Sequence, residues 1–148
     1  MLPIEILRRS NAVLVVDYPS KDVPETLARG GFAVTVQGGP GPEDYVDYEL
    51  ENEVVVTRHR GTVPERVDLV YVHRPVNELP GILSVATALG ARAIWLQSGE
   101  RSDGEKDPHG CWLDDQRAAE ARTIVDQSGL AYVQEPYIGD VIRELRSP

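Results

Sequence analysis

Short apolar segments alternate along the chain with longer segments of helical periodicity. In the short segments, apolar and often β-branched residues run without interruption, which is typical of strands buried on both faces of a sheet. A shorter apolar run is flanked by charged residues on both sides. We therefore predict strands at residues 12–16, 32–36, 67–72, 93–96 and 130–133, with a further short strand at 54–56.

Four helices are predicted between and after these strands. Apolar residues recur at spacings of three and four in the two longest segments, which gives each one apolar face. The predicted helices lie at residues 24–29, 77–89, 114–127 and 137–145. Short polar residues that can cap free amides stand before three of them, namely Asp22, Asn77 and Asp114. Glycines that can end a helix follow three of them, namely Gly30, Gly90 and Gly129.

The alternation of strands and helices predicts the fold class. Strand–helix–strand units form right-handed crossovers, which place parallel strands in one sheet and helices on both of its faces. No linker, repeat or low-complexity segment divides the chain. We therefore expect residues 1–148 to form a single α/β domain of Rossmann-like type, with a parallel sheet of about five to six strands.

Charge and cysteine content narrow the classes of partner. The chain has 24 acidic and 15 basic side chains and a net charge of −9, which disfavours nucleic acid and anionic membrane as main partners. No apolar run approaches the roughly 20 residues of a membrane span, and residues 1–10 lack the features of a signal peptide. Cys111 is the only cysteine, so a reducing, cytoplasmic location is expected.

Candidate binding residues follow from the predicted sheet. In open parallel sheets, ligands bind beyond the carboxyl ends of the strands, where the strand order reverses. The loops at these ends are polar and rich in Gly, Ser and Pro, although ordinary loops share that composition. The candidate ligand-binding residues are Asp17, Tyr18, Pro19, Ser20, Lys21, Gln37, Gly38, Gly39, His73, Arg74, Pro75, Gln97, Ser98 and Gly99.

The loop after the first strand disfavours a standard dinucleotide site. Residues 17–21 contain no glycine, so the G-x-G-x-x-G fingerprint, which lets backbone approach a pyrophosphate, is absent. Ser20 and Lys21 could hold a single phosphate at the start of the next helix. They fit equally well as a turn residue and a solvated surface charge.

Three other features have competing interpretations. Arg74 could counter a phosphate or form an ion pair with a nearby acid such as Glu78. Trp95 lies in the middle of a predicted strand, which favours a core position over a stacking platform. His109 and Cys111 are close in sequence, but no second pair completes a four-ligand zinc site. We therefore predict no metal site.

Two segments resemble the CoA-binding domain family. Residues 90–99, Gly-Ala-Arg-Ala-Ile-Trp-Leu-Gln-Ser-Gly, are similar to its G-A-K-x-x-W-x-Q-x-G segment. Residues 63–75 resemble its I-P-x-x-V-D-x-V-x-x-F-R-R-P pattern. The members are small Rossmann-like proteins similar to the N-terminal domains of succinyl-CoA synthetase α subunits and ADP-forming acyl-CoA synthetases. The resemblance covers roughly residues 11–135, and it implies coenzyme A as the ligand.

The sequence departs from the family pattern near the expected ligand. The family's first loop is longer and glycine-led, whereas residues 17–21 here read Asp-Tyr-Pro-Ser-Lys. Residues 134–136 replace a closing D-R-C, and residues 101–112 form an inserted loop. A carboxylate at Asp17 would repel a diphosphate unless Lys21 or Arg74 compensates for it.

Three functions remain open from the sequence. The first is a non-catalytic binding module for coenzyme A, an acyl-CoA or a related adenine nucleotide. In it, residues 97–99 would face the ligand, residues 37–39 would lie near the ribose or adenine, and Arg74 and Lys21 would counter phosphates. The second is a diverged member that has lost ligand binding and serves as a protein-interaction scaffold or homodimer, with Trp112 as either a contact anchor or a buried pin for its loop.

The third function is a small enzyme acting on a CoA-linked or nucleotide substrate. His73 follows a predicted strand directly and is the best acid–base candidate by position. No serine or carboxylate constellation around it can be argued from the sequence. The sequence therefore favours the binding module over the enzyme.

Overall fold

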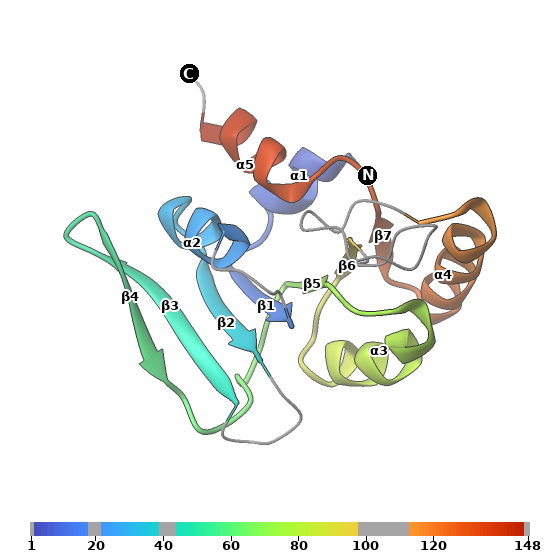
Figure 1. Ribbon diagram of the computed structural model, residues 1–148, viewed down its shortest axis with the longest axis horizontal. Coiled ribbons are helices and arrows are strands. Elements are labelled where there is room, and N and C mark those ends of the chain that lie inside the picture. Colours follow the sequence, from blue (N-terminus) through green and yellow to red (C-terminus); the bar gives the residue numbers. More distant parts are fainter. Residues whose placement is uncertain (1, 18–21, 39–43, 98–112, 147–148) are drawn as a thin grey trace.

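The computed structural model describes residues 2–17, 22–38, 44–97 and 113–146. This part of the chain forms one seven-stranded sheet in the order β4-β3-β2-β1-β5-β6-β7 (Figure 1). The strands are β1 (Ala12–Val16), β2 (Ala33–Gln37), β3 (Tyr45–Glu51), β4 (Val54–His59), β5 (Leu69–Val72), β6 (Ala93–Leu96) and β7 (Ala131–Val133). The helices are α1 (Pro3–Arg8), α2 (Asp22–Arg29), the 3-10 turn η1 (Val76–Glu78), α3 (Leu79–Ala88), α4 (Asp115–Ser128) and α5 (Ile138–Arg146).

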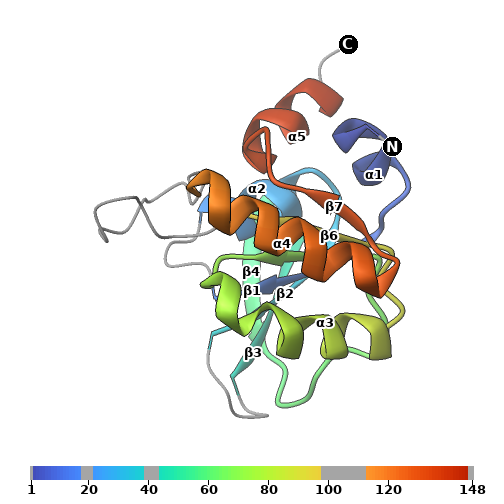
Figure 2. The same cartoon turned by 90° about the vertical axis from the view of Figure 1, so that its right-hand side faces the viewer.

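The predicted α/β architecture is confirmed. Strands β2, β1, β5, β6 and β7 are parallel, and the sheet lies between two helical layers (Figure 2). Val13 and Val15 of β1 pack in the core beneath α1, α2 and α5. Leu14 and Val16 pack in the opposite core beneath α3 and α4. This division explains why all five residues of β1 are apolar, since both faces of the strand are buried.

The sheet is larger than predicted, and it is not wholly parallel. Strand β3 pairs antiparallel with β2 and with β4, so the expected strict alternation of strand and helix is wrong between β2 and β5. The expected short strand at 54–56 extends to His59. Its partner β3 was not predicted because charged side chains interrupt its apolar positions, in the sequence Tyr-Val-Asp-Tyr-Glu-Leu-Glu.

Helix boundaries agree with the sequence at α4 and differ at α3. Asp114 caps α4 by accepting a hydrogen bond from the backbone N–H of Arg117 at 2.8 Å, and Gly129 ends that helix with φ of 80°. Asn77 was expected to cap its helix but lies inside the 3-10 turn Val76–Glu78, and α3 begins at Leu79. Asp22 is the first residue of α2 rather than its cap.

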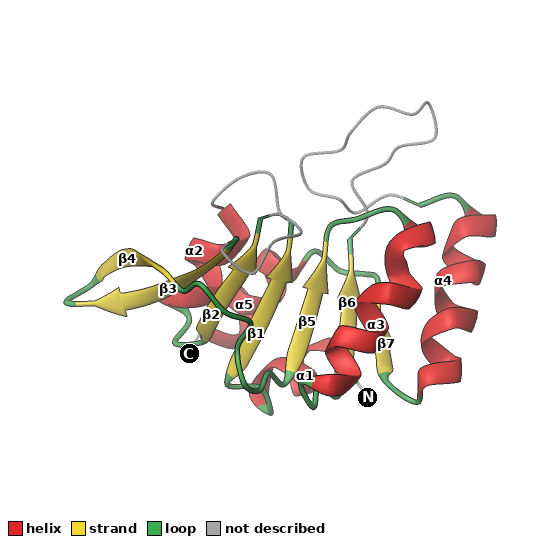
Figure 3. Cartoon of the chain, turned by 90° about the horizontal axis from the view of Figure 1, so that it is seen from below, coloured by secondary structure: helices red, strands yellow, loops and turns green. Residues whose placement is uncertain are grey.

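The connections place a crevice between β1 and β5. Strand β1 is followed by α2 on one face, and β5 is followed by α3 on the other face (Figure 3). The connections that follow these two adjacent strands therefore run to opposite faces of the sheet. Such a place is a topological switch point, where open α/β sheets bind ligands. No helix within the described ranges is long and apolar enough to cross a bilayer.

Candidate functional site

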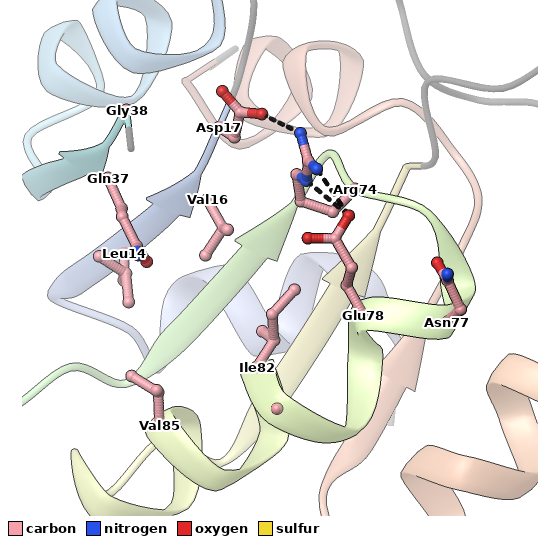
Figure 4. A pocket seen from close by; sticks show the side chains of 11 residues that line it. Leu14, Val16, Asp17, Gln37, Gly38, Arg74, Asn77, Glu78, Ile82 and Val85 are labelled. Carbon is pink, nitrogen blue, oxygen red and sulfur yellow. Dashed lines mark hydrogen bonds and ion pairs between the residues drawn. The ribbon is translucent and has the colours of Figure 1, made fainter. Parts of the chain in front are cut away.

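A pocket of about 740 Å³ lies at this switch point. Its walls come from the carboxyl ends of β1 and β2, the turn after β5, and one face of α3 (Figure 4). The apolar part of the wall consists of Leu14, Val16, Ile82 and Val85. The polar and small residues around it are Asp17, Gln37, Gly38, Arg74, Asn77, Glu78 and Gly81.

Arg74 bridges two carboxylates at the rim of this pocket. Its Nη1 donates to Oδ2 of Asp17, while its Nε and Nη2 donate to Oε2 of Glu78 at 3.0 and 2.6 Å. Hydrogen bonds to Glu78 and to Asp17 raise the pKa of the Arg74 guanidinium against the opposing effect of burial. Of the two interpretations of Arg74 that the sequence left open, the structure shows the ion pair with Glu78, and Arg74 also compensates for the charge of Asp17. The three side chains together carry a net charge of −1.

Asp17 has an unusual backbone conformation for a residue with a side chain. Its φ is 56°, in the left-handed region that glycine adopts without steric cost. Its N–H donates to the carbonyl of Gln37 at 2.8 Å, which extends the β1–β2 pairing by one residue. A glycine-led loop, as in the family pattern, would satisfy this geometry, and Asp17 places a carboxylate there instead.

Gln37 and Gly38 form the β2 side of the pocket. Gln37 is the last residue of β2, and its side chain extends toward the pocket next to Leu14 (Figure 4). The N–H of Gly38 donates to the carbonyl of Asp44 at 2.9 Å, so this wall is held by the beginning of the β3–β4 hairpin. A neutral amide therefore occupies the pocket at the end of the second strand.

Gln97 holds a turn and does not line the pocket. Its side chain is fully buried; Nε2 donates to the carbonyl of Pro136 at 3.1 Å, and Oε1 accepts the N–H of Ile138 at 3.3 Å. The indole Nε1 of Trp95 donates to the same Pro136 carbonyl at 3.3 Å. Trp95 is also fully buried, which confirms its predicted core position.

The other candidates are distributed over the edge of the sheet. His73 is 7% exposed, and its N–H continues the sheet by donating to the carbonyl of Val16 at 3.1 Å. Pro75 lines a separate groove between η1 and α4. The structure thus brings Asp17, Gln37, Gly38 and Arg74 together in one pocket, without His73, Pro75 or Gln97. Seven candidates lie outside the described residues, namely Tyr18, Pro19, Ser20, Lys21, Gly39, Ser98 and Gly99.

Comparison with known proteins identifies the family. The sequence matches the family described as CoA binding domain over residues 16–139. The chain belongs to the CoA-binding domain family. The matched region includes every described residue of the pocket except Leu14.

A solved structure from Thermus thermophilus, titled "The structure of cell-free ID.343", has the same kind of fold as this CoA-binding domain. It aligns with a TM-score of 0.56 and 19% identity, over 95% of this chain and 94% of that one. Among curated proteins, no significant match was found.

Sequence reasoning missed the α3 wall of the pocket. Gly81, Ile82 and Val85 of α3 line the pocket, together with Asn77 and Glu78 of η1, whereas the predicted helix at 77–89 was interpreted only as a core element. The positions of the apolar residues along this helix could have indicated the pocket wall. Leu79, Leu83 and Ala86 already form a buried stripe, so Ile82 and Val85 lie on an adjacent part of the helix surface and are free to line a ligand site.

Metal binding finds no support in the described part of the chain. No group of three or more His, Cys, Asp or Glu side chains is arranged there to hold a metal ion. His109, Cys111 and the inserted loop that carries Trp112 lie outside the described residues.

Proposed function

We propose that this CoA-binding domain is a non-catalytic module that holds coenzyme A, an acyl-CoA or a related adenine nucleotide in the pocket at the β1–β5 switch point. The proposal rests on the agreement of two findings about the same region of the fold. The family match covers the strand ends and helix that build the pocket, and the pocket lies where open α/β sheets bind nucleotide ligands.

The size and lining of the pocket support a ligand of this class. Its volume of about 740 Å³ falls within the range of small-molecule sites, roughly 300–1,000 Å³. Val16, Ile82 and Val85 line an apolar wall, with the fully buried Leu14 behind it, and an adenine ring or a pantetheine chain can pack against this wall. The amides of Gln37 and Asn77 and the carboxylate of Glu78 can fix the orientation of polar groups.

Gln37 favours CoA over NAD as the nucleotide. In dinucleotide-binding domains, a carboxylate roughly 20 residues after the first loop binds the ribose 2′-hydroxyl of NAD. Gln37 stands 20 residues after Asp17 and is neutral, so it does not repel a phosphate on the ribose, as in CoA. The absence of glycine from residues 17–21 also disfavours a close approach of backbone to a dinucleotide pyrophosphate.

The pocket lining supports binding rather than catalysis. Among the described residues that line it, there is no histidine, serine or cysteine. A nucleophile with an adjacent base, the usual constellation for covalent catalysis, is therefore not formed by these residues. His73, the acid–base candidate, packs at the end of β5 with 7% exposure and is not part of the pocket wall.

Thermal shift with CoA, acetyl-CoA, ATP and NAD tests the proposal. A ligand at a hundredfold excess over its dissociation constant stabilises the folded state by about 2.7 kcal/mol. For a domain of this size that corresponds to roughly 5–10 °C in Tm. We expect the largest shifts with CoA and acetyl-CoA and the smallest with NAD. Native mass spectrometry of the untreated protein should reveal any copurified nucleotide. No shift with any of the four ligands would contradict the proposal and favour the protein-interaction scaffold.

A further inference from the structure

We propose that Asp17 limits the affinity of this pocket for phosphate-bearing ligands by neutralising Arg74. The inference rests on the proposed function, because it concerns the same pocket and the same ligand class. It assigns Asp17, which lines the pocket, a further role as a specificity-determining residue.

The charge balance of the pocket is the first observation. Arg74 is the only cation among the described residues that line it. Its guanidinium already donates to Asp17 on one side and to Glu78 on the other. A ligand phosphate that uses Arg74 must therefore compete with two carboxylates, each of which also repels it.

The position of Asp17 is the second observation. It directly follows β1 and precedes α2, in the segment where Rossmann-type domains place phosphates against a helix N-terminus. The first turn of α2 adds Asp22 and Glu25, and the Asp22 carboxylate accepts a hydrogen bond from the hydroxyl of Tyr137 at 2.6 Å. The described side chains near this end of β1 therefore include several carboxylates, and their negative charge disfavours a bound phosphate.

The backbone of Asp17 is the third observation. A φ of 56° is sterically unfavourable for an L-residue, and glycine would avoid this cost. The carboxylate at this position offsets the cost in part by joining β1 to the turn after β5 through Arg74. Asp17 therefore has two effects. It makes a structural contact with Arg74, and its carboxylate repels anionic ligands.

Isothermal titration calorimetry, which measures the affinity of two variants for CoA, tests the inference. Asp17→Asn removes the charge and keeps a residue type that tolerates the left-handed region, whereas Asp17→Gly removes the whole side chain at a φ that glycine adopts freely. At low ionic strength, near 10 mM, we expect either variant to bind CoA about five- to tenfold more tightly than the wild type. Asp126→Asn is the matched control. It makes the same change in net charge at an exposed site on α4 away from the pocket, and it should leave the affinity nearly unchanged.

Salt dependence separates an electrostatic role from a structural one. Repulsion by Asp17 is screened as the Debye length falls from about 30 Å at 10 mM to about 8 Å at physiological ionic strength. The gain in affinity should therefore shrink with added salt. If the wild type binds CoA and both variants bind it equally or more weakly, or gain affinity independently of salt, the inference is wrong and the proposed function stands. If neither the wild type nor the variants bind CoA, both are wrong.

Discussion

Gln97 illustrates how a residue in a family motif can have a structural role. It belongs to the segment by which the sequence resembles CoA-binding domains, and it was expected to face the ligand. Its amide instead satisfies both a carbonyl and an N–H in the turn between β7 and α5. Because buried backbone groups need partners, a glutamine at this position is explained by the turn without any ligand.

Replacing Gln97 by leucine should therefore destabilise the domain. The substitution keeps the size of the side chain but leaves the Ile138 N–H without its acceptor in a buried region, a loss of about 1–3 kcal/mol. Urea unfolding measures this change. Gln127→Leu, at an exposed position on α4, is the control and should change stability by less than about 0.5 kcal/mol. Equal effects of the two substitutions would contradict the assigned role.

Asp68 has a comparable role at the amino ends of the parallel strands, directly before β5. Its Oδ2 accepts the backbone N–H groups of Asn11 and Ala12 at 2.8 and 3.0 Å, and its Oδ1 lies 3.6 Å from Nη2 of Arg92. Burial tends to raise the pKa of Asp68, but the two amides, assisted by Arg92 and Arg66, lower the pKa overall. The ionised carboxylate therefore stabilises the junction of α1, β1 and β5.

The lowered pKa predicts how stability depends on pH. The unfolded chain binds the Asp68 proton at a higher pH than the folded chain does, so stability rises with pH across this range. The contribution is present above the unfolded pKa, about 3.9, and is lost as pH falls through the folded pKa. At pH 7 we expect Asp68→Asn to lose about 1–3 kcal/mol of unfolding free energy.

Urea unfolding of the wild type and Asp68→Asn between pH 7 and pH 2.5 measures this dependence. The difference between the two proteins should narrow as the pH falls below about 4. Asp126→Asn, in which an exposed carboxyl on α4 is replaced, serves as the control. A difference that stays constant over this range would show that the charge of Asp68 does not contribute.

At the scale of elements, the β3–β4 hairpin adds two strands to the edge of the parallel sheet. The chain turns at Asn52 and Glu53, whose φ angles are 51° and 67°. Two-residue hairpin loops of type I′ require positive φ at both positions and strongly prefer Asn-Gly. Asn52 suits its position, but Glu53 stands where glycine is preferred.

Replacing Glu53 by glycine should therefore stabilise the hairpin. Relief of the left-handed conformation outweighs the added freedom of the unfolded chain, giving a gain of up to about 1 kcal/mol. The hydrogen bond from Arg29 goes to the backbone carbonyl of residue 53, so it survives the change. Thermal unfolding measures the result. The same replacement at Glu51, inside β3, should destabilise, and a loss of stability at both positions would contradict this view of the turn.

These elements also explain what the sequence could and could not predict. Strands β1, β5 and β6 were predicted because all but one of their residues are buried and their apolar runs are uninterrupted. The hairpin lacks the Asn-Gly signal, and its outer residues are charged, so β3 was missed. Helix α1 was missed because it is only six residues long, from Pro3 to Arg8, and shows little periodicity.

The sequence could predict only those pocket residues whose positions follow from the order of the strands. Asp17, Gln37, Gly38 and Arg74 follow strand ends, and the parallel order of the strands brings those ends together. The orientation of a side chain depends on packing that no local pattern encodes. For this reason Gln97, which also follows a strand, points toward Pro136, while Ile82 and Val85 reach the pocket from a helix.

At the scale of the whole molecule, the two helical layers create the pocket by diverging. Helices α1, α2 and α5 cover one face and α3 and α4 the other (Figure 2), so the end of β1 lies beside β5 with no crossover between them. Leu14 and Val16, which line the pocket, also belong to the core beneath α3 and α4, while Val13 and Val15 of the same strand belong to the opposite core. The pocket is therefore a part of the sheet that α3 does not fully cover.

The affinity of the Gly81→Leu variant for CoA tests this account most directly. Gly81 lines the pocket, and a Cβ added there meets no other atom within 4 Å. Leucine should therefore occupy space needed by the ligand, while its higher helix propensity supports α3 by roughly 0.5–1 kcal/mol. Ala88→Leu, at an exposed position on the same helix outside the pocket, is the control. By isothermal titration, we predict that Gly81→Leu weakens CoA binding by about tenfold or more, while Ala88→Leu changes it by less than about twofold. Wild-type affinity in a folded Gly81→Leu protein would contradict the placement of the ligand between β1 and α3.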